Sequence, residues 1–413
     1  SLPLSENNLV MGKPVVYHLA DRIVKMVESA TLQMTAKARK LKQEGKDVIN
    51  LSIGEPDFDT PQFIKDAAKV ALDQGYTKYT PVSGLIELKR SIQEKFKRDN
   101  NIEYALDEIV VSNGAKQSIA NVAMSVLNEG DEVIIFAPYW VSYLEIVHLA
   151  GGVPVIVHAG IENDFKVLPS QLEAAITPKT RMVIFSSPCN PTGSVYSMEE
   201  LQAFAEILGT KDEIYIVSDE IYEYINYTGN HASIASIPSV KDQTITINGF
   251  SKGFAMTGWR LGYMGAPREV AKATDKMQGQ FTSGAASFSQ KAASLALETD
   301  LTETYKMRDA FLKRRDLILN LLKEIPGIKC NVPEGAFYVF PNVSAYYGKK
   351  TPDGTVIENG DHLCTYILDT AYVALVAGSA FGDEECIRIS YAASDEEIIE
   401  ACKRIKEALS HLN

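Results

Sequence analysis

The sequence has few cysteines and no long apolar run. Its cysteines are an odd number, widely spaced and without a C-x-x-C pair, so we expect neither a disulfide framework nor a metal site, and a reducing compartment. The five are Cys189, Cys330, Cys364, Cys386 and Cys402. No apolar run approaches the ~20 residues that cross a bilayer. The first ten residues, SLPLSENNLV, lack a basic region followed by an apolar core, so we expect no signal peptide and a cytoplasmic protein.

The sequence also has fewer basic than acidic residues. Lysine and arginine total 41 against 53 acidic residues, a net charge of −12, which disfavours binding to nucleic acid or to anionic membranes. No G-x-G-x-x-G or G-x-x-x-x-G-K-[ST] motif follows an expected strand, so the nucleotide-binding loops are excluded. Hydrophobic residues make up 46% and charged residues 23%, as in an ordinary globular protein. The 413 residues suffice for two or three domains.

Short β-branched runs alternate with helical stretches between residues 107 and 265. Strands separated by helices indicate a mostly parallel sheet covered on both faces. We therefore predict an α/β fold with three layers and a seven-stranded sheet. The expected strands are Glu108–Val111, Glu132–Phe136, Val153–Val157, Met182–Phe185, Ile214–Val217, Thr244–Ile247 and Gly262–Gly265.

The two ends of the chain have a different pattern. The stretch Leu301–Glu324 predicts one long charged helix, and a last helix begins near Asp395. The first ~50 residues hold two basic amphipathic stretches and no clear strand. We predict a large domain over 53–305 and a smaller α+β domain built from 1–52 and 306–413.

Unusual residues follow five of the expected strands. In open α/β sheets, ligands bind beyond the carboxyl ends of the strands, so these residues should meet on one rim. They are SNGAKQ (112–117), APYW (137–140), SSPCNPTG (186–193), SDEIY (218–222) and NGFSKGFAMTGWR (248–260).

Two of these segments suit an anion and a cationic ring. Gly114, Ala115 and Lys116 open a helix, where backbone N–H groups and the helix dipole favour a phosphate; the alternative is an ordinary Asn-Gly turn. Asp219 ends an apolar strand, and its carboxylate could keep a buried heterocyclic nitrogen protonated; the alternative is a helix N-cap. Tyr222 lies on the same side of the chain if that turn is helical.

Lys252 and Trp140 complete the set. Lys252 stands between Ser251 and Gly253, and a partly desolvated lysine has a lowered pKa and becomes a nucleophilic amine. Trp140 could cover the face of a planar ring. Most lysines are solvated and most tryptophans belong to the core, so neither residue decides the matter alone.

Together the signals describe a phosphorylated, cationic pyridine ring bonded to a lysine. Asp219 would pair with the ring nitrogen, and Asn190 and Tyr222 with a ring oxygen. The helix start at Gly114, with Ser251 and Arg260, would take the phosphate. These are the requirements of pyridoxal 5'-phosphate, for which the protein supplies binding and orientation.

At this level of detail the sequence resembles the class I aminotransferases of the fold-type-I pyridoxal phosphate enzymes, and most of all the bacterial-type aspartate aminotransferases. The combination of SDEIY with SKGFAMTGWRLGY is highly specific. The matching motifs are SATLQMTAKA (29–38), GEPDFDTP (54–61), KYTPVSG (78–84), NGAKQ (113–117), PYWVSY (138–143), NPTG (190–193), SDEIY (218–222), SKGFAMTGWRLGY (251–263), GAFYVF (335–340) and IRISYA (387–392).

The resemblance implies roles that the residues alone do not. Lys252 would be the Schiff-base lysine, and Arg388 would bind the substrate α-carboxylate in a bidentate pair, assisted by Asn190 and the backbone of Gly54. Tyr79 would reach the cofactor phosphate of a neighbouring subunit, which implies a homodimer with active sites at its interface. Amino acid and 2-oxo acid substrates would react in two stages with ping-pong kinetics.

Substrate choice follows from the same resemblance. The stretch GQFTSGAASFSQ (279–290) has no arginine or lysine, whereas animal-type enzymes bind the aspartate side chain there. In the prokaryotic subgroup Lys116 takes that role, and Thr31 lines the pocket, so we expect aspartate and 2-oxoglutarate. Relatives that accept prephenate carry a basic residue where this chain has Val27.

Several alternatives remain open. The enzyme could be an aromatic, alanine or prephenate aminotransferase, or a carbon–sulfur lyase with the same cofactor. An aminotransferase-like regulator without catalytic activity would carry an added DNA-binding domain, and the chain has no spare ~60–80 basic residues to build one.

Overall fold

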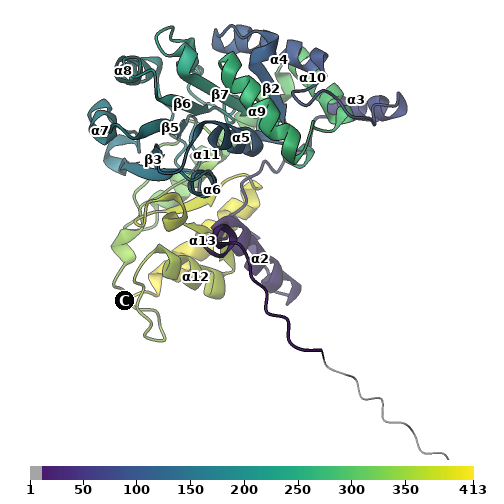
Figure 1. The fold of residues 1–413 in the computed structure, drawn as a ribbon. Helices are drawn as coiled ribbons and strands as arrows, with labels where there is room; N and C mark the ends of the chain where they lie inside the picture. The colour runs from purple at the N-terminus through teal and green to yellow at the C-terminus, as the bar shows by residue number, and fades with distance from the viewer. Residues whose placement is uncertain (1–11) are drawn as a thin grey trace, which may run out of the picture.

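A seven-stranded sheet is the central feature of residues 12–413, the residues that this computed structural model describes (Figure 1). The strand order is β2-β8-β7-β6-β5-β3-β4. β8 runs antiparallel to both neighbours, and the other neighbouring pairs are parallel. The strands are β2 (Ile109–Ser112), β3 (Glu132–Ala137), β4 (Val153–His158), β5 (Thr180–Ser186), β6 (Tyr215–Asp219), β7 (Thr244–Gly249) and β8 (Gly262–Gly265).

Helices cover both faces of this sheet because successive strand residues point to opposite sides. On β5, Met182 and Ile184 face the core under α5, α6 and α9, whereas Val183 and Phe185 face the core under α7 and α8. These helices are α5 (Ala115–Val126), α6 (Ser142–Leu149), α9 (Arg268–Phe281), α7 (Pro169–Ala175) and α8 (Met198–Leu208). The seven predicted runs each coincide with a strand to within one or two residues.

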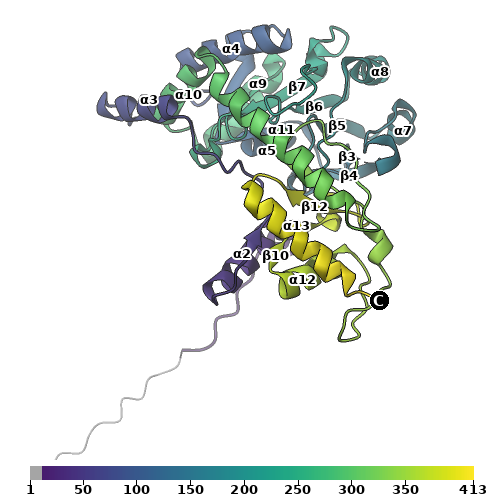
Figure 2. The ribbon, with the colours of Figure 1, turned by 180° about the vertical axis from the view of Figure 1, so that it is seen from behind.

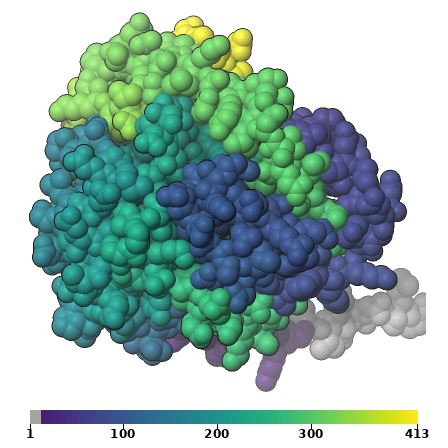
Figure 3. Space-filling view, turned by 90° about the horizontal axis from the view of Figure 1, so that it is seen from above, coloured from purple at the N-terminus to yellow at the C-terminus, as the bar shows by residue number. Residues whose placement is uncertain are grey.

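Three more helices pack beside β2 and β8. They are α3 (Gln62–Asp73), α4 (Ile86–Asn100) and α10 (Ser287–Glu298). Ile92 of α4 and Ala292 of α10 share one core with Tyr263 of β8. Seen from above, the blue residues of α3 and α4 lie against green residues of the α9–α10 region (Figure 3).

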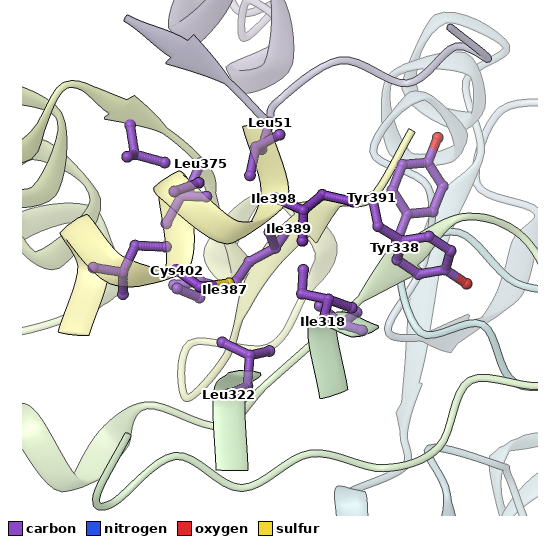
Figure 4. Close-up of a cluster of buried hydrophobic side chains, with 14 of the residues drawn as sticks. Leu51, Ile318, Leu322, Tyr338, Leu375, Ile387, Ile389, Tyr391, Ile398 and Cys402 are labelled. Atoms are coloured by element: carbon purple, nitrogen blue, oxygen red, sulfur yellow. The ribbon is translucent and has the colours of Figure 1, made fainter. Parts of the chain in front are cut away.

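A second core joins the two ends of the chain. β1 pairs in parallel with β10, so that Ile49 lies opposite Val373, and β12 lies between β11 and β9 in an antiparallel sheet. Leu51 packs there with Ile318, Ile389 and side chains from the last helix (Figure 4). The elements are α2 (Ala30–Gln43), β1 (Ile49–Asn50), α11 (Thr302–Lys323), β9 (Tyr338–Val339), α12 (Gly360–Ala371), β10 (Val373–Ala374), β11 (Val376–Ala377), β12 (Ile387–Ser390) and α13 (Asp395–Ser410).

Local signals explain where the last helices lie. The side chain of Ser394 accepts a hydrogen bond of 3.1 Å from the backbone N–H of Glu397, a capping box that starts α13. The predicted long helix is α11, which runs beside α13 (Figure 2).

The remaining helical segments are short. They are α1 (Asp21–Val24), η1 (Leu106–Glu108), η2 (Ile161–Asn163), η3 (Ile234–Ser236), η4 (Lys241–Gln243), η5 (Thr257–Trp259), η6 (Ser344–Tyr346) and η7 (Gly378–Phe381).

The predicted fold class is therefore confirmed, including the smaller α+β part from both chain ends. β1 was not foreseen. The boundaries at residues 53 and 305 stay a prediction. Among residues 12–413, no helix combines the length and apolar character needed to cross a membrane.

Candidate active site

A cavity of about 560 Å³ lies beyond the carboxyl ends of β5, β6 and β7, between the large sheet and the second core. Eleven predicted cofactor or substrate residues line it, together with Thr31 of α2. They are Gly54, Ala115, Lys116, Trp140, Asn190, Asp219, Tyr222, Ser251, Lys252, Arg260 and Arg388. The rim inferred from the strand ends thus corresponds to one cavity.

Lys252 stands in the loop that follows β7. Its ammonium group contacts the carbonyl oxygen of Gly54 and lies 5.6 Å from the ring centre of Tyr222. Burial, reinforced by the positive charge of Arg388, lowers the pKa of Lys252 to about 8. A fraction of such a lysine is a neutral nucleophile at neutral pH, and that fraction becomes the larger part above about pH 8.

Asp219 ends β6 and is buried. Its Oδ2 accepts a hydrogen bond of 2.5 Å from the hydroxyl of Tyr143, and its Oδ1 accepts one of 3.2 Å from the backbone N–H of Ile221. Burial raises the pKa of Asp219 to about 6. A turn follows at residues 221–224 rather than a helix, so the helix N-cap alternative is wrong. We expected Tyr222 on the same side of the chain as Asp219 if this turn were helical. The turn is not helical, yet Tyr222 still lines the cavity.

The helix start at Gly114 has room for an anion. Gly114 has φ +90, and a β-carbon there would lie 2.3 Å from Nη2 of Arg260, so glycine lets the guanidinium lie against the first turn of α5. The first N–H groups of this helix have no partner within the helix. Arg260 is fixed by donating from Nη1 to the carbonyl oxygen of Thr257 at 3.0 Å. Gly114 itself adjoins the cavity without lining it.

Trp140 and Lys116 lie together on one wall. The ammonium of Lys116 is 4.9 Å from the centre of the Trp140 ring, and Trp140 packs edge-on against Tyr143 with ring centres 5.5 Å apart. Burial, followed by the charge of Arg260, lowers the pKa of Lys116. The wall offers an aromatic face and a cation side by side.

Arg388 of β12 is a buried cation that pairs with no carboxylate of residues 12–413. Its side chain is 2% exposed, its Nη1 donates to Oδ1 of Asn190 at 3.0 Å, and its Nη2 donates to the carbonyl oxygen of Ser52 at 2.7 Å. Nε has no hydrogen-bond partner in the described part of the chain. Burying an unpaired charge is costly, so the arrangement indicates an anion that completes it.

Besides Gly114, two residues named from the sequence do not line the cavity. Tyr79 is 97% exposed and does not line it, and its expected role toward a neighbouring subunit stays a prediction. Val27 is 70% exposed and also lies outside the lining.

The sequence did not reveal the residues that support the site. The hydroxyls of Tyr222 and Tyr338 lie 2.7 Å apart, and Tyr143 donates to Asp219. Both new tyrosines stand inside motifs already noted, PYWVSY and GAFYVF, but nothing in those motifs names their partners. Glu55 and Arg39 also line the cavity.

Comparison with known proteins gives the family of this chain. Residues 46–405 match the model for the aminotransferases of class I and II. The chain belongs to this family. The resemblance inferred from the motifs is therefore confirmed.

Members of the family with curated names or solved structures match along most of the chain. The bifunctional aspartate aminotransferase and glutamate/aspartate-prephenate aminotransferase of Petunia hybrida is 48% identical over 397 residues, 95% of this chain and 82% of that protein. The aspartate aminotransferase structure from Rhizobium meliloti has a TM-score of 0.93 at 45% identity, covering 96% of this chain and 100% of its own. That of Thermus thermophilus with maleate has a TM-score of 0.89 at 40% identity, with coverage of 95% and 100%.

Proposed function

We propose that this aminotransferase uses pyridoxal 5'-phosphate to move the amino group of L-aspartate to 2-oxoglutarate, giving oxaloacetate and L-glutamate. One observation carries the proposal: Lys252, Asp219 and Arg388 line a single cavity. An amine with a lowered pKa, a buried carboxylate and an incompletely paired guanidinium are the groups that this reaction needs.

The residues present fit the cofactor. The first turn of α5 at Gly114, with Ser251 and Arg260, would hold the phosphate. Asp219 would hold the ring nitrogen in its protonated form, and a cationic partner there would relieve the cost of burying that carboxylate. When bound, pyridoxal phosphate supplies an electron-withdrawing ring that accepts the electron pair of the broken Cα–H bond.

Asn190, Tyr222 and Trp140 would fix the orientation of the ring. Asn190 and Tyr222 would hydrogen-bond its hydroxyl oxygen, and Trp140 would cover one face. The hydroxyl of Tyr222 is itself in contact with Tyr338, which limits its rotation. A fixed ring keeps the reacting Cα–H bond within reach of Lys252.

Lys252 moves the proton. With a pKa of about 8, a fraction of the side chain is neutral at pH 7 to 8. This neutral amine would accept the proton from the substrate Cα and deliver it to C4′ of the cofactor. The same residue holds the cofactor between turnovers. Because the amino group is first transferred to the enzyme and then to a second substrate, the kinetics are ping-pong.

Arg388 and Lys116 select the substrate. Nη1 and Nη2 of Arg388 donate to Asn190 and to the carbonyl of Ser52. Their remaining N–H groups would form a bidentate pair with the α-carboxylate, with the backbone of Gly54 beside it. Lys116 also lines the cavity and offers a second cation for the side-chain carboxylate. The aspartate names of the relatives and the maleate in the Thermus structure favour a dicarboxylate substrate.

Prephenate transamination is a second candidate, because the Petunia relative carries it in its name. The basic residue that we associate with this activity is replaced here by the exposed Val27. We therefore favour aspartate.

The same proposal includes a homodimer in the cytoplasm. Tyr79 is 97% and Phe281 71% exposed, so both side chains are accessible to a partner subunit. Tyr79 would reach the phosphate bound by the partner. The five cysteines are unpaired, as expected in a reducing compartment.

The half-reaction tests this function. The protein with its cofactor is mixed with aspartate and no oxo acid, and we expect the spectrum of the aldehyde form to change to that of the amine form. Adding 2-oxoglutarate should reverse the change. Release of pyruvate or ammonia from a sulfur amino acid, without this reversal, would instead identify a lyase.

A further inference from the structure

The segment that carries Asp219 and Tyr222 has a second, inward face. Asp219 and Tyr222 line the cavity. Glu220, which lies between them in the sequence, and Glu223, which follows Tyr222, do not line it and are buried, 1% and 5% exposed. Two buried carboxylates are tolerated only with matching positive charge and hydrogen bonds.

Glu223 has a full set of partners. The buried ammonium of Lys95 and the amide of Asn100 both contact it, and Nδ2 of Asn248 donates to it at 3.0 Å. Burial raises the pKa of Glu223, but the charges of Lys95 and His231 together outweigh that effect, so the pKa is lowered and Glu223 stays ionised.

Glu220 depends on His231 for its positive charge. Ser218 and Ser233 donate hydrogen bonds to it at 2.8 and 2.5 Å, but both are neutral. Nε2 of His231 lies 2.7 Å from Oε1 of Glu220 and 3.8 Å from Oε1 of Glu223. No lysine or arginine among residues 12–413 forms an ion pair with Glu220.

The surroundings of His231 favour its charged form. Burial lowers its pKa, but the hydrogen bond to Glu220 and the charge of Glu223 outweigh that effect, so the pKa of His231 is raised. Its Nδ1 has no hydrogen-bond partner in the described chain, so the contacts that favour the charge are those of Nε2 with the two carboxylates. Two carboxylates then face two cations, His231 and Lys95.

We propose that His231 is a positioning residue for Asp219: as an imidazolium it completes a charge-balanced network with Glu220, Glu223 and Lys95 that holds the Asp219–Tyr222 turn against the cavity. The inference rests on the proposed use of pyridoxal phosphate, because Asp219 is positioned for the ring of that cofactor.

The network also reaches the loop of Lys252. Asn248, which donates to Glu223, accepts a hydrogen bond of 2.8 Å from the N–H of Gly249, three residues before Lys252. The ends of β6 and β7 are therefore tied together behind the site. Glu220, Glu223 and His231 have the spacing of metal ligands, but the ammonium of Lys95 already supplies the second positive charge.

Other titratable groups face the network. Asp99 of α4 lies near Glu223 and is ionised, since its contacts with Arg98 and Tyr224 outweigh its burial and lower its pKa. Burial raises the pKa of Tyr104 and of Tyr263, so they stay neutral. His231, whose pKa is raised from an ordinary value of 6.5, is therefore the group of the network whose charge we test by changing the pH.

The protonation state of His231 is the first test. Nitrogen-15 labelled histidine is followed by NMR in the full-length protein, which has six histidines, and the His231 signal is assigned by its loss in His231→Gln. We expect both ring nitrogens to carry a proton at pH 7. A neutral imidazole at that pH overturns the proposal, whatever reaction the enzyme catalyses.

Charge rescue is the second test. His231→Gln keeps a donor for Glu220 but removes the charge, so the turn should move and the Kd for pyridoxal phosphate should rise about tenfold. The double variant E220Q/H231Q has no unpaired charge and should return to within about twofold of wild type. A double variant as weak as His231→Gln would show that only packing matters. His148→Gln, exposed on α6, is the matched control.

The pH dependence separates positioning from stability alone. As the pH rises through the pKa of His231, the wild-type Kd should increase relative to that of E220Q/H231Q. A constant ratio contradicts the proposal. Failure of aspartate to convert the bound cofactor would contradict the proposed function while leaving these measurements intact.

Discussion

The hydroxyl of Tyr143 on α6 donates a 2.5 Å hydrogen bond to Oδ2 of Asp219 at the end of β6. The bond stabilises the ionised carboxylate, opposing the burial that raises its pKa to about 6. Asp219 is thereby kept as an anion at neutral pH, as required for a partner of a cationic ring nitrogen.

Tyr143→Phe removes that donor. A hydrogen bond to a charged group is worth about 1.5–3 kcal/mol, so we expect the Kd for pyridoxal phosphate to rise by about 10- to 100-fold. Without this bond the pKa of Asp219 rises, so as the pH is lowered the variant should lose affinity at a higher pH than the wild type. Fluorescence titration of the cofactor-free protein measures this. Tyr196→Phe, which removes a buried hydroxyl bonded to the N–H of Val167, should reduce stability without changing the Kd.

Lys252→Ala should abolish the visible absorbance of the lysine-bound cofactor and nearly all turnover. In the proposed function the amine is both the attachment point and the proton carrier, and no other lysine among residues 12–413 forms a hydrogen bond with Gly54 at the cavity wall. Absorbance spectra and steady-state rates are the measurements. Lys276→Ala, exposed on α9, is the control, and normal turnover in Lys252→Ala would contradict the assignment.

Arg388→Lys should impair every substrate. A lysine retains the charge but cannot reproduce a fork that holds Asn190, Ser52 and a carboxylate together. We expect kcat/KM to fall at least about 100-fold for aspartate and for alanine alike, since both share the α-carboxylate; loss of a buried charge-assisted bond supports that size. A selective loss for aspartate would mean that Arg388 binds the side chain instead.

Lys116→Gln should be selective. We expect the KM for aspartate and 2-oxoglutarate to rise about tenfold or more, as for loss of one charged hydrogen bond, with little change for alanine. The comparison of these substrates in one kinetic series checks it. An equal loss for alanine would place Lys116 on the cofactor or the shared α-carboxylate.

Asp219 should make the cofactor-free protein less stable as the pH rises. Its folded pKa of about 6 exceeds the ordinary 3.8, so the folded state binds the proton more tightly, and that stability is present below pH 3.8 and lost as the pH rises through 6. A shift of this size corresponds to about 3 kcal/mol. In Asp219→Asn this loss should be absent, as judged by urea unfolding at pH 4 and pH 7 of the cofactor-free protein.

The sequence predicted the residues with distinctive motifs better than those that support them. Lys252 and Asp219 could be found because each is a charged residue in a distinctive motif, SKGF or SDEIY, at or just after the end of an apolar strand. Tyr338 could not, because its contact with Tyr222 joins residues 116 positions apart and depends on how the two cores pack. Arg388 was identified only through the family resemblance, since a strand arginine carries no local sign of burial.

Local patterns also decided which strands of the fold could be predicted. The seven strands of the large sheet have apolar runs long enough to be recognised. β1 has two residues and exists because Ile49 pairs with Val373, so no local pattern could predict it.

The pairing of β1 with β10 has a consequence for the synthesis of the chain on the ribosome. Ile49 emerges early, but its partner Val373 follows on the order of half a minute later at ordinary elongation rates. The carbonyl of Ser52, just after β1, waits still longer for the guanidinium of Arg388. A nascent chain can therefore form its large sheet first, whereas the carboxylate-binding end of the cavity is completed only when translation is nearly finished.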